Sequence, residues 1–162
     1  MKQTYRVLAG LIALGVLVQA ASVAFGWFDV LSAVDSGTVI DGSYEGNAGH
    51  MIHGIVGMTV MPLLALILLI VSFFARNAVP GAVKWAGIVF GVTLLQVALA
   101  FAAFSAPVIG ALHGINALAL LGVAGRAGAL TRDTRAAGTG TAAGAVPVPR
   151  TESSSTGTNL PA

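Results

Sequence analysis

Three histidines are the residues of this chain with the clearest capacity for chemistry. His50 and His53 stand at the start of one long apolar stretch, and His113 stands near the start of another. A neutral imidazole binds transition metals and haem iron through one ring nitrogen. Because ionisable residues are costly inside a membrane, those found there usually serve a function. The histidines therefore indicate a metal or haem site, provided that the fold brings the two stretches together.

Composition narrows the remaining chemistry. The chain has no cysteine, which excludes disulfides, thiolate zinc sites, cysteine-bound iron–sulfur clusters and covalently attached c-type haem. Its formal net charge of +2 is too small to indicate nucleic acid as a partner. We find no grouping of a nucleophile, a base and an orienting acid, so the sequence favours a protein that is not an enzyme.

The elements that must position the histidines are transmembrane helices. Of the 162 residues, 56% are hydrophobic and only 9% are charged, and the apolar residues come in long uninterrupted blocks. Four blocks have about the 20 residues that a span requires. They are 7–27, 51–75, 83–104 and 108–124. We therefore predict an all-α fold, an integral membrane up-down four-helix bundle over residues 1–126.

The basic residues orient this bundle. Short cytoplasmic segments of membrane proteins carry an excess of Lys and Arg. Four spans place all eight basic residues on one side, whereas the charged residues of the first loop on the other side are all acidic. The basic residues are Lys2, Arg6, Arg76, Lys84, Arg126, Arg132, Arg135 and Arg150. The pattern predicts a multi-pass plasma-membrane protein with both termini cytoplasmic and the histidines near the outer face.

Three segments outside the blocks complete the prediction. The outer loop, 29–49, is rich in Gly, Ser and Asp, and we expect a short interfacial helix over 29–34. The tail, 127–162, has no apolar periodicity and is predicted to be a disordered cytoplasmic segment. A cleaved signal peptide is an alternative interpretation of the first block. Cleavage would leave three spans in the same orientation.

Depth and topology bring two of the histidines together. The second and fourth spans both run from outside to inside and are diagonal partners in an up-down bundle. At about 1.5 Å per residue, His53 and His113 lie at similar depths. They are the predicted metal ligands, one from each span. The sequence leaves open whether His50 or His53 points more directly inward, because the two differ by only about sixty degrees around the helix.

Polar residues within the spans have two interpretations. Gln19, Gln96 and Asn116 are expected to form interhelical hydrogen bonds, since few other forces join helices in lipid. The alternative is contact with a bound group. Asn116 is the best placed for such contact, because it shares a helical face with His113 at a spacing of three residues.

Short motifs around the two histidines resemble a known family. The segments His53-Gly54-Ile55-Val56-Gly57 and Leu112-His113-Gly114-Ile115-Asn116-Ala117-Leu118 are similar to one half-bundle of haem A synthase. The chain also resembles small bacterial four-helix membrane proteins of uncharacterised family. The haem A synthase resemblance implies that His53 and His113 are axial ligands. The family's glutamate before the first histidine is absent here, so haem A synthesis itself is not predicted.

Three functions follow from these observations. The first is a bis-histidine b-type haem bundle for electron transfer or haem handling, with His50 and Asn116 beside the bound group. The second is an outward-facing copper or zinc site formed by the three histidines with Asp41 or Glu45. The third is a membrane scaffold or accessory subunit without a cofactor. All three have the lipid bilayer as a partner, and the third adds another membrane protein or a second copy of the chain.

Overall fold

The computed structural model confirms an all-α bundle of four long helical rods. It describes the backbone over residues 1–140 and the side chains over residues 1–132. The first rod is α1, Lys2–Asp35. The second is continuous through α2, Ala48–Ile55, a π-helical segment η1, Val56–Val60, and α3, Met61–Ala75. The third and fourth are α4, Ala82–Ser105, and α5, Ile109–Gly140.

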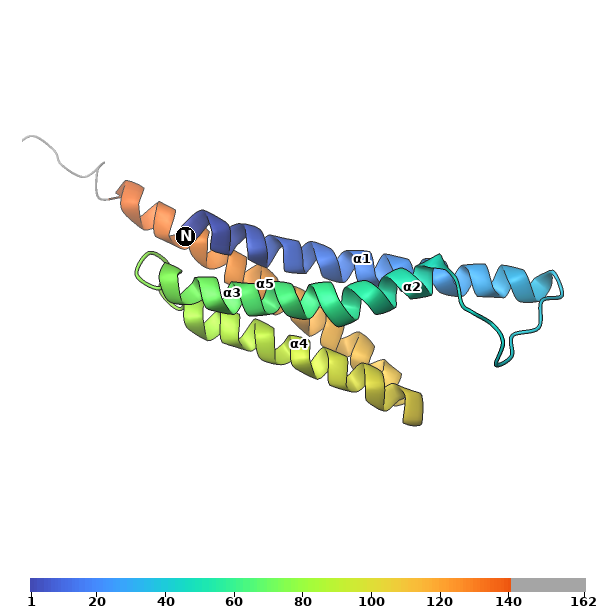
Figure 1. Ribbon diagram of the computed structural model, residues 1–162. Helices are drawn as coiled ribbons and strands as arrows, with labels where there is room; N and C mark the ends of the chain where they lie inside the picture. Colours follow the sequence, from blue (N-terminus) through green and yellow to red (C-terminus); the bar gives the residue numbers. More distant parts are fainter. Residues whose placement is uncertain (141–162) are drawn as a thin grey trace, which may run out of the picture.

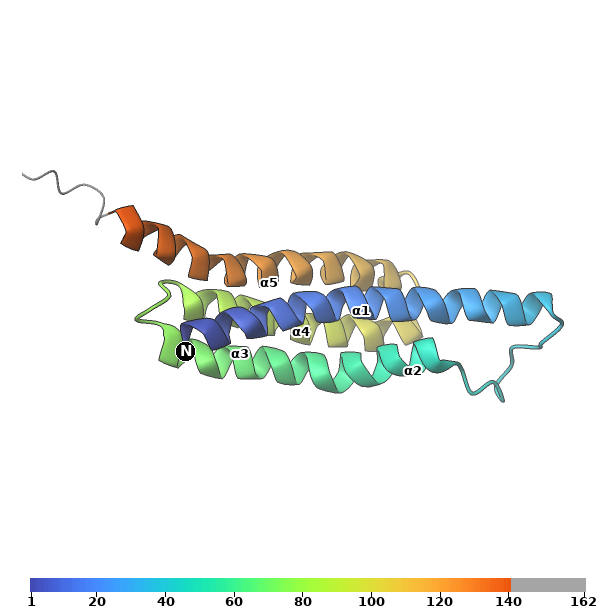
Figure 2. The same cartoon turned by 90° about the horizontal axis from the view of Figure 1, so that it is seen from above.

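The rods follow an up-down path around the bundle. Helix α1 packs against α2, α3 and α5, and α4 packs against α3 and α5. Helix α5 passes behind α3 in Figure 1, and the turned view in Figure 2 shows the two on opposite sides of the bundle. The second and fourth spans are therefore diagonal partners, as the sequence predicts.

Length and apolar character make the chain a multi-pass integral membrane protein. Each of the four rods is long and apolar enough to cross a bilayer, with a mean hydropathy of 1.3 to 2.6 over its most apolar window. Large apolar side chains such as Leu14, Phe74 and Leu118 are exposed and must contact lipid. The N-terminus, the α3–α4 link and the end of α5 lie at one end, hereafter the basic end (Figure 1).

The predicted outer loop begins too early. Helix α1 runs without a break through 29–35, where the sequence suggested a separate interfacial helix. At about 1.5 Å per residue, its 34 residues span roughly 50 Å, more than the hydrocarbon core of about 30 Å. The helix stops where Gly37 adopts a left-handed φ of 94°, a conformation that glycine tolerates. The loop proper therefore starts at Ser36 rather than at Asp29.

The predicted start of the tail also needs correction. Helix α5 continues past 126 to Gly140, and the side chains of Ala127, Leu130 and Thr131 are buried. The low hydropathy of this segment suggested a tail. However, alanine favours a helix, and small side chains let α5 approach α1, where Gly128 lies close to Ala9. The rest of the predicted tail, 141–162, lies outside the described residues.

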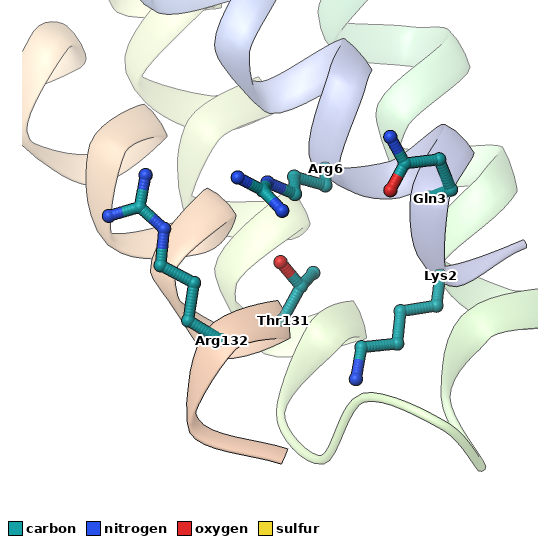
Figure 3. Close-up of a pocket in the computed structure, with 5 residues that line it drawn as sticks. All are labelled: Lys2, Gln3, Arg6, Thr131 and Arg132. Atoms are coloured by element: carbon teal, nitrogen blue, oxygen red, sulfur yellow. The ribbon is translucent and has the colours of Figure 1, made fainter. Parts of the chain in front are cut away.

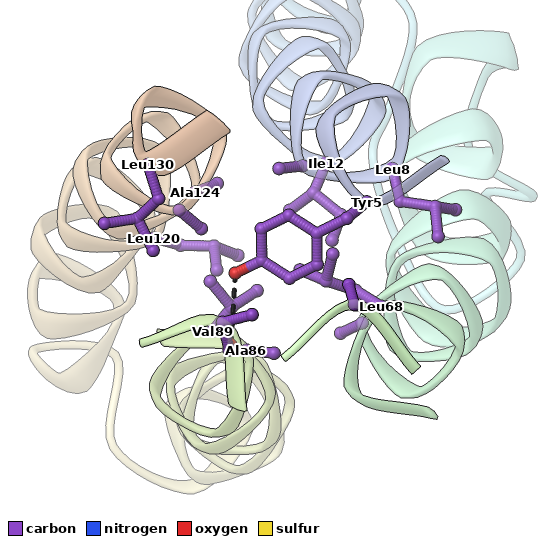
Figure 4. Packing of buried hydrophobic residues seen from close by; sticks show 14 of the residues in the cluster. Tyr5, Leu8, Ile12, Leu68, Ala86, Val89, Leu120, Ala124 and Leu130 are labelled. Carbon is purple, nitrogen blue, oxygen red and sulfur yellow. Dashed lines mark hydrogen bonds between the residues drawn. The ribbon is translucent and has the colours of Figure 1, made fainter. Parts of the chain in front are cut away.

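The packed core occupies the basic half of the bundle. Tyr5 is fully buried at its centre, and its hydroxyl donates to the carbonyl oxygen of Ala82 at the start of α4 (Figure 4). The surrounding layers come from all four rods and are mostly alanine and branched aliphatic residues, among them Ile12, Leu68, Ala86, Val89, Leu120 and Ala124. Small side chains allow close helix packing, which is the main source of helix association in lipid.

The opposite half of the α4–α5 hairpin lacks such a core. No residue of α4 after Thr93 is buried, and none of α5 before Leu120. In Figure 1 the hairpin diverges from α1 and α2 toward this end. The bundle is thus tight at the basic end and splayed at the end where the sequence places the histidines.

At the splayed end, α1 and α2 are held together by a close backbone contact. A Cβ atom added to Gly49 would lie 2.5 Å from the backbone nitrogen of Gly26 and 2.5 Å from the carbonyl oxygen of Ser22. Nearby, Asn47 caps α2 by accepting from the His50 backbone N–H, and its amide donates to the carbonyl oxygen of Gly26. Only glycine fits at position 49.

We predict that Gly49→Ala lowers the stability of the folded protein in detergent by about 1–3 kcal/mol, because backbone atoms must move apart. The matched control is Gly91→Ala, since a Cβ atom there meets open space. That control keeps the helix-favouring effect of alanine without the clash. Thermal unfolding followed by circular dichroism measures both, and equal midpoints would contradict the close contact.

Candidate functional site

The structure brings His53 and His113 into contact across the bundle. Their ring centroids are 6.1 Å apart and the ring planes are inclined by 63°. One ring comes from the second span and the other from the fourth, and both are half-buried. The expected match in depth between the diagonal spans is therefore met, and it is His53 rather than His50 that faces His113.

Both imidazoles are oriented in the same way. The Nδ1 atom of His53 lies 3.0 Å from the carbonyl oxygen of Gln19, and Nδ1 of His113 lies 3.0 Å from that of Gln96. A carbonyl oxygen only accepts, so each Nδ1 carries the proton and donates it. The Nε2 atom of each ring then holds a lone pair. This is the tautomer that a metal-ligating histidine adopts when a backbone carbonyl orients it.

A chain of hydrogen bonds supports His113 from the neighbouring helix α4. The amide nitrogen of Gln96 lies 3.0 Å from Nε2 of His113 and donates to it. The amide oxygen of Gln96 accepts from the Asn116 side chain at 2.7 Å, and the same Asn116 nitrogen lies 3.1 Å from the carbonyl oxygen of Val92. The predicted interhelical bonds of Gln96 and Asn116 are thus present. Asn116 bonds to Gln96 and supports His113 only indirectly.

Gln19 completes this polar layer from α1 and leaves one group without a partner. Its side-chain nitrogen is buried and, among the described residues, has no hydrogen-bond partner. Its side-chain oxygen lies 3.0 Å from where a Cβ atom on Gly57 would be, so glycine is what makes room for it. Gly57 belongs to η1, one turn after His53. Such π-helical segments are rare and often found at functional sites.

The glycines that follow the two histidines lie on exposed faces of their helices. A Cβ atom added to Gly54 or to Gly114, the residues that follow His53 and His113, would meet no atom within 4 Å. Together with the unpacked outer half of α4 and α5, this leaves the histidine pair at the edge of the splayed end rather than in a closed core.

The third histidine and the loop acids lie apart from the pair. The His50 ring packs edge-on against Trp27 at a centroid distance of 5.6 Å. Asp41 accepts from the hydroxyl and the backbone N–H of Ser43, which lowers the pKa of its carboxyl. Within the described part of the chain, no three His, Asp or Glu side chains gather to hold a metal ion. The predicted copper or zinc site that adds Asp41 or Glu45 to the histidines is therefore not assembled.

Comparison with known proteins adds no relative: no family model, curated protein or solved structure matches the chain. The resemblance to half of haem A synthase accordingly remains a hypothesis. The facing histidines and their hydrogen-bond partners indicate a site.

The sequence identified the two facing histidines but not what holds them. It singled out Gln19 and Gln96 as polar residues in spans, without pairing either with a histidine. The signal was only partial: Gln96 lies nine residues before Ser105, the end of α4, whereas His113 lies four residues after Ile109, the start of α5. Choosing the partner required the rotation of each helix, which apolar blocks do not encode.

The polar layer predicts opposite changes in stability when two of its amide side chains are replaced. Asn116→Leu removes two interhelical hydrogen bonds and should lower stability by about 1 kcal/mol. Gln19→Leu removes a buried nitrogen that has no partner among the described residues and should raise stability of the ligand-free protein by about 1 kcal/mol. Thermal unfolding of the purified protein measures both changes. A loss of stability in Gln19→Leu equal to that in Asn116→Leu would contradict this assignment.

Proposed function

We propose that the chain is a b-type haem-binding membrane protein in which His53 and His113 are the two axial ligands, serving electron transfer or haem handling. The observation that carries the proposal is the facing pair of imidazoles from diagonal spans. Each ring is oriented by a backbone carbonyl on the adjacent helix, which leaves Nε2 as the ligating atom.

The separation of the rings fits ligation to one metal. A bound imidazole nitrogen lies about 2.0–2.1 Å from its metal, so two rings on opposite sides of one ion have centroids roughly 6 Å apart. The observed separation is 6.1 Å. Binding one metal between the rings would therefore require little change in the distance between the two helices.

The surroundings fit a bulky group better than a bare ion. A bare divalent ion usually takes three or four protein ligands, and the described residues provide no third His, Asp or Glu at the pair. A macrocycle supplies four ligands of its own but needs width. The outer half of the α4–α5 hairpin contains no buried residue, so the bundle is loosely packed on this side of the pair. Gln19, whose backbone carbonyl orients His53, also keeps a buried side-chain nitrogen with no partner among the described residues.

One local change must accompany binding. The Gln96 amide donates to Nε2 of His113. That amide must release the lone pair before it can bind a metal, while the Nδ1 hydrogen bond to the Gln96 carbonyl remains to fix the ring. Gln96 would thus hold His113 in the neutral tautomer until the group arrives.

The ligand set decides the class of chemistry. Haem bound by two histidines has no open position at iron, which favours electron transfer over oxygen chemistry. The backbone carbonyl oxygens of Gln19 and Gln96 would set the orientation of the two ligating rings. A catalytic role is therefore not proposed.

The proposal predicts visible absorption that depends on two histidines and not on the third. Full-length protein purified in mild detergent from haem-replete cells should show a Soret band and split visible bands on reduction with dithionite. His53→Ala and His113→Ala should each lose this spectrum. His50→Ala is the matched control and should keep it, because its ring packs on Trp27 and not on the pair.

Other outcomes would redirect the interpretation. A folded, colourless protein that also fails to take up added haemin would overturn the haem proposal. The remaining candidate would then be a scaffold or accessory subunit without a cofactor. Spectra lost only in His50→Ala would show that the histidine pair is not the ligand set.

A further inference from the structure

A second, independent site is formed at the basic end, between the start of α1 and the end of α5. A hollow of about 510 Å³ is lined by Lys2, Gln3 and Arg6 from α1 and by Thr131 and Arg132 from α5. Figure 3 shows Arg6 reaching from α1 toward α5, with the Thr131 hydroxyl beside it. Three of the five lining side chains are basic and none is acidic.

A second hollow of about 310 Å³ adjoins the first and shares Arg6 and Arg132 with it. Apart from these two arginines, only alanine and glycine line it, from α1 and from α5. On α1 the lining runs from Arg6 to Ala13, seven residues or about 10 Å along the helix toward the middle of the bilayer. It is therefore an apolar groove that begins at a cluster of positive charge.

Charge and shape together define the ligand. Basic pockets between transmembrane helices at the cytoplasmic face bind anionic lipid headgroups. A free phosphate would need only the basic hollow, and a partner helix would need only the small-residue groove. A phospholipid matches both, with its phosphate among the basic side chains and an acyl chain in the groove. The nearest acid in the sequence, Asp133, stands among Arg126, Arg132 and Arg135, so the segment remains basic.

We propose that this paired hollow and groove, between α1 and α5, is a binding site for one anionic phospholipid, with the phosphate held by Arg6 and Arg132. The lipid would fill the seam where α5 extends beyond the predicted bundle and packs on α1. Its position at the basic end places it at the opposite end of the bundle from the histidine pair, so it does not depend on the proposed haem.

Native mass spectrometry of the full-length protein tests the charged part of the site. The protein in detergent is titrated with phosphatidylglycerol or with phosphatidylcholine of the same acyl chains, and retained lipid is counted. We expect preferential retention of phosphatidylglycerol. Removing two charges in the double variant Arg6→Gln/Arg132→Gln should weaken that retention roughly twenty-five-fold, at about fivefold per charge. Arg76→Gln/Lys84→Gln is the control, since both residues are at the same end and outside the lining.

A second pair of variants tests the groove. Gly125→Leu places a large side chain in the groove, whereas Gly122→Leu adds the same side chain on the same helix outside the lining. Only the first should weaken lipid retention, by fivefold or more, and circular dichroism should show both variants to be equally helical. Soluble glycerol phosphate should not displace the lipid at equal concentration.

Three results would overturn the proposal. Equal retention of the two lipids would remove the role of charge. Unchanged retention in the double arginine variant would remove the hollow as the site. Displacement by glycerol phosphate, with no effect of Gly125→Leu, would identify an anion site without a lipid.

Discussion

Lipid offers no hydrogen bonds, and this constraint governs the whole structure. Every backbone polar group in a span must be satisfied within its own helix, and every polar side chain must find a partner in the bundle or carry a cost. In the polar layer, side chains from all four rods lie at one depth, and most of them find hydrogen-bond partners in the bundle. His53 bonds to a carbonyl of α1, and His113 bonds to Gln96 of α4. The unsatisfied Gln19 nitrogen is the exception within the described chain, and it lies at the candidate site.

The two ends of the bundle are built on different principles. At the basic end, alanine and small aliphatic residues allow four helices to pack closely around Tyr5, and the Arg126 guanidinium lies over the Trp85 ring, 5.7 Å from its centroid. At the other end, no residue of α4 after Thr93 and none of α5 before Leu120 is buried, and the α4–α5 hairpin diverges from α1 and α2 (Figure 1). A tight end fixes the helices in depth and rotation. A splayed end can then present two aligned histidines without a closed core between them.

The two ends differ in charge as well as in packing. The histidine pair lies toward the end that carries the acidic loop, and the hollow lined by Lys2, Arg6 and Arg132 lies at the basic end. The packed core between them contains no charged side chain among its members, so direct electrostatic coupling between the two sites should be weak.

The sequence by itself determined the number of spans, the shared end of the basic residues and the equal depth of His53 and His113. Long apolar blocks, charge bias and the fixed rise of a helix are one-dimensional signals, and they are sufficient for those conclusions. The sequence misplaced the start of the outer loop and the end of the bundle, because helices can continue beyond the hydrocarbon core wherever neighbours or propensity support them. Only the tertiary structure decided that His53 rather than His50 faces His113, and that Gln96 forms hydrogen bonds with His113. It also decided that Arg6 and Arg132 line the same groove. Each of these depends on how the helices are rotated and splayed, and that is set by the packing of small side chains on several helices at once.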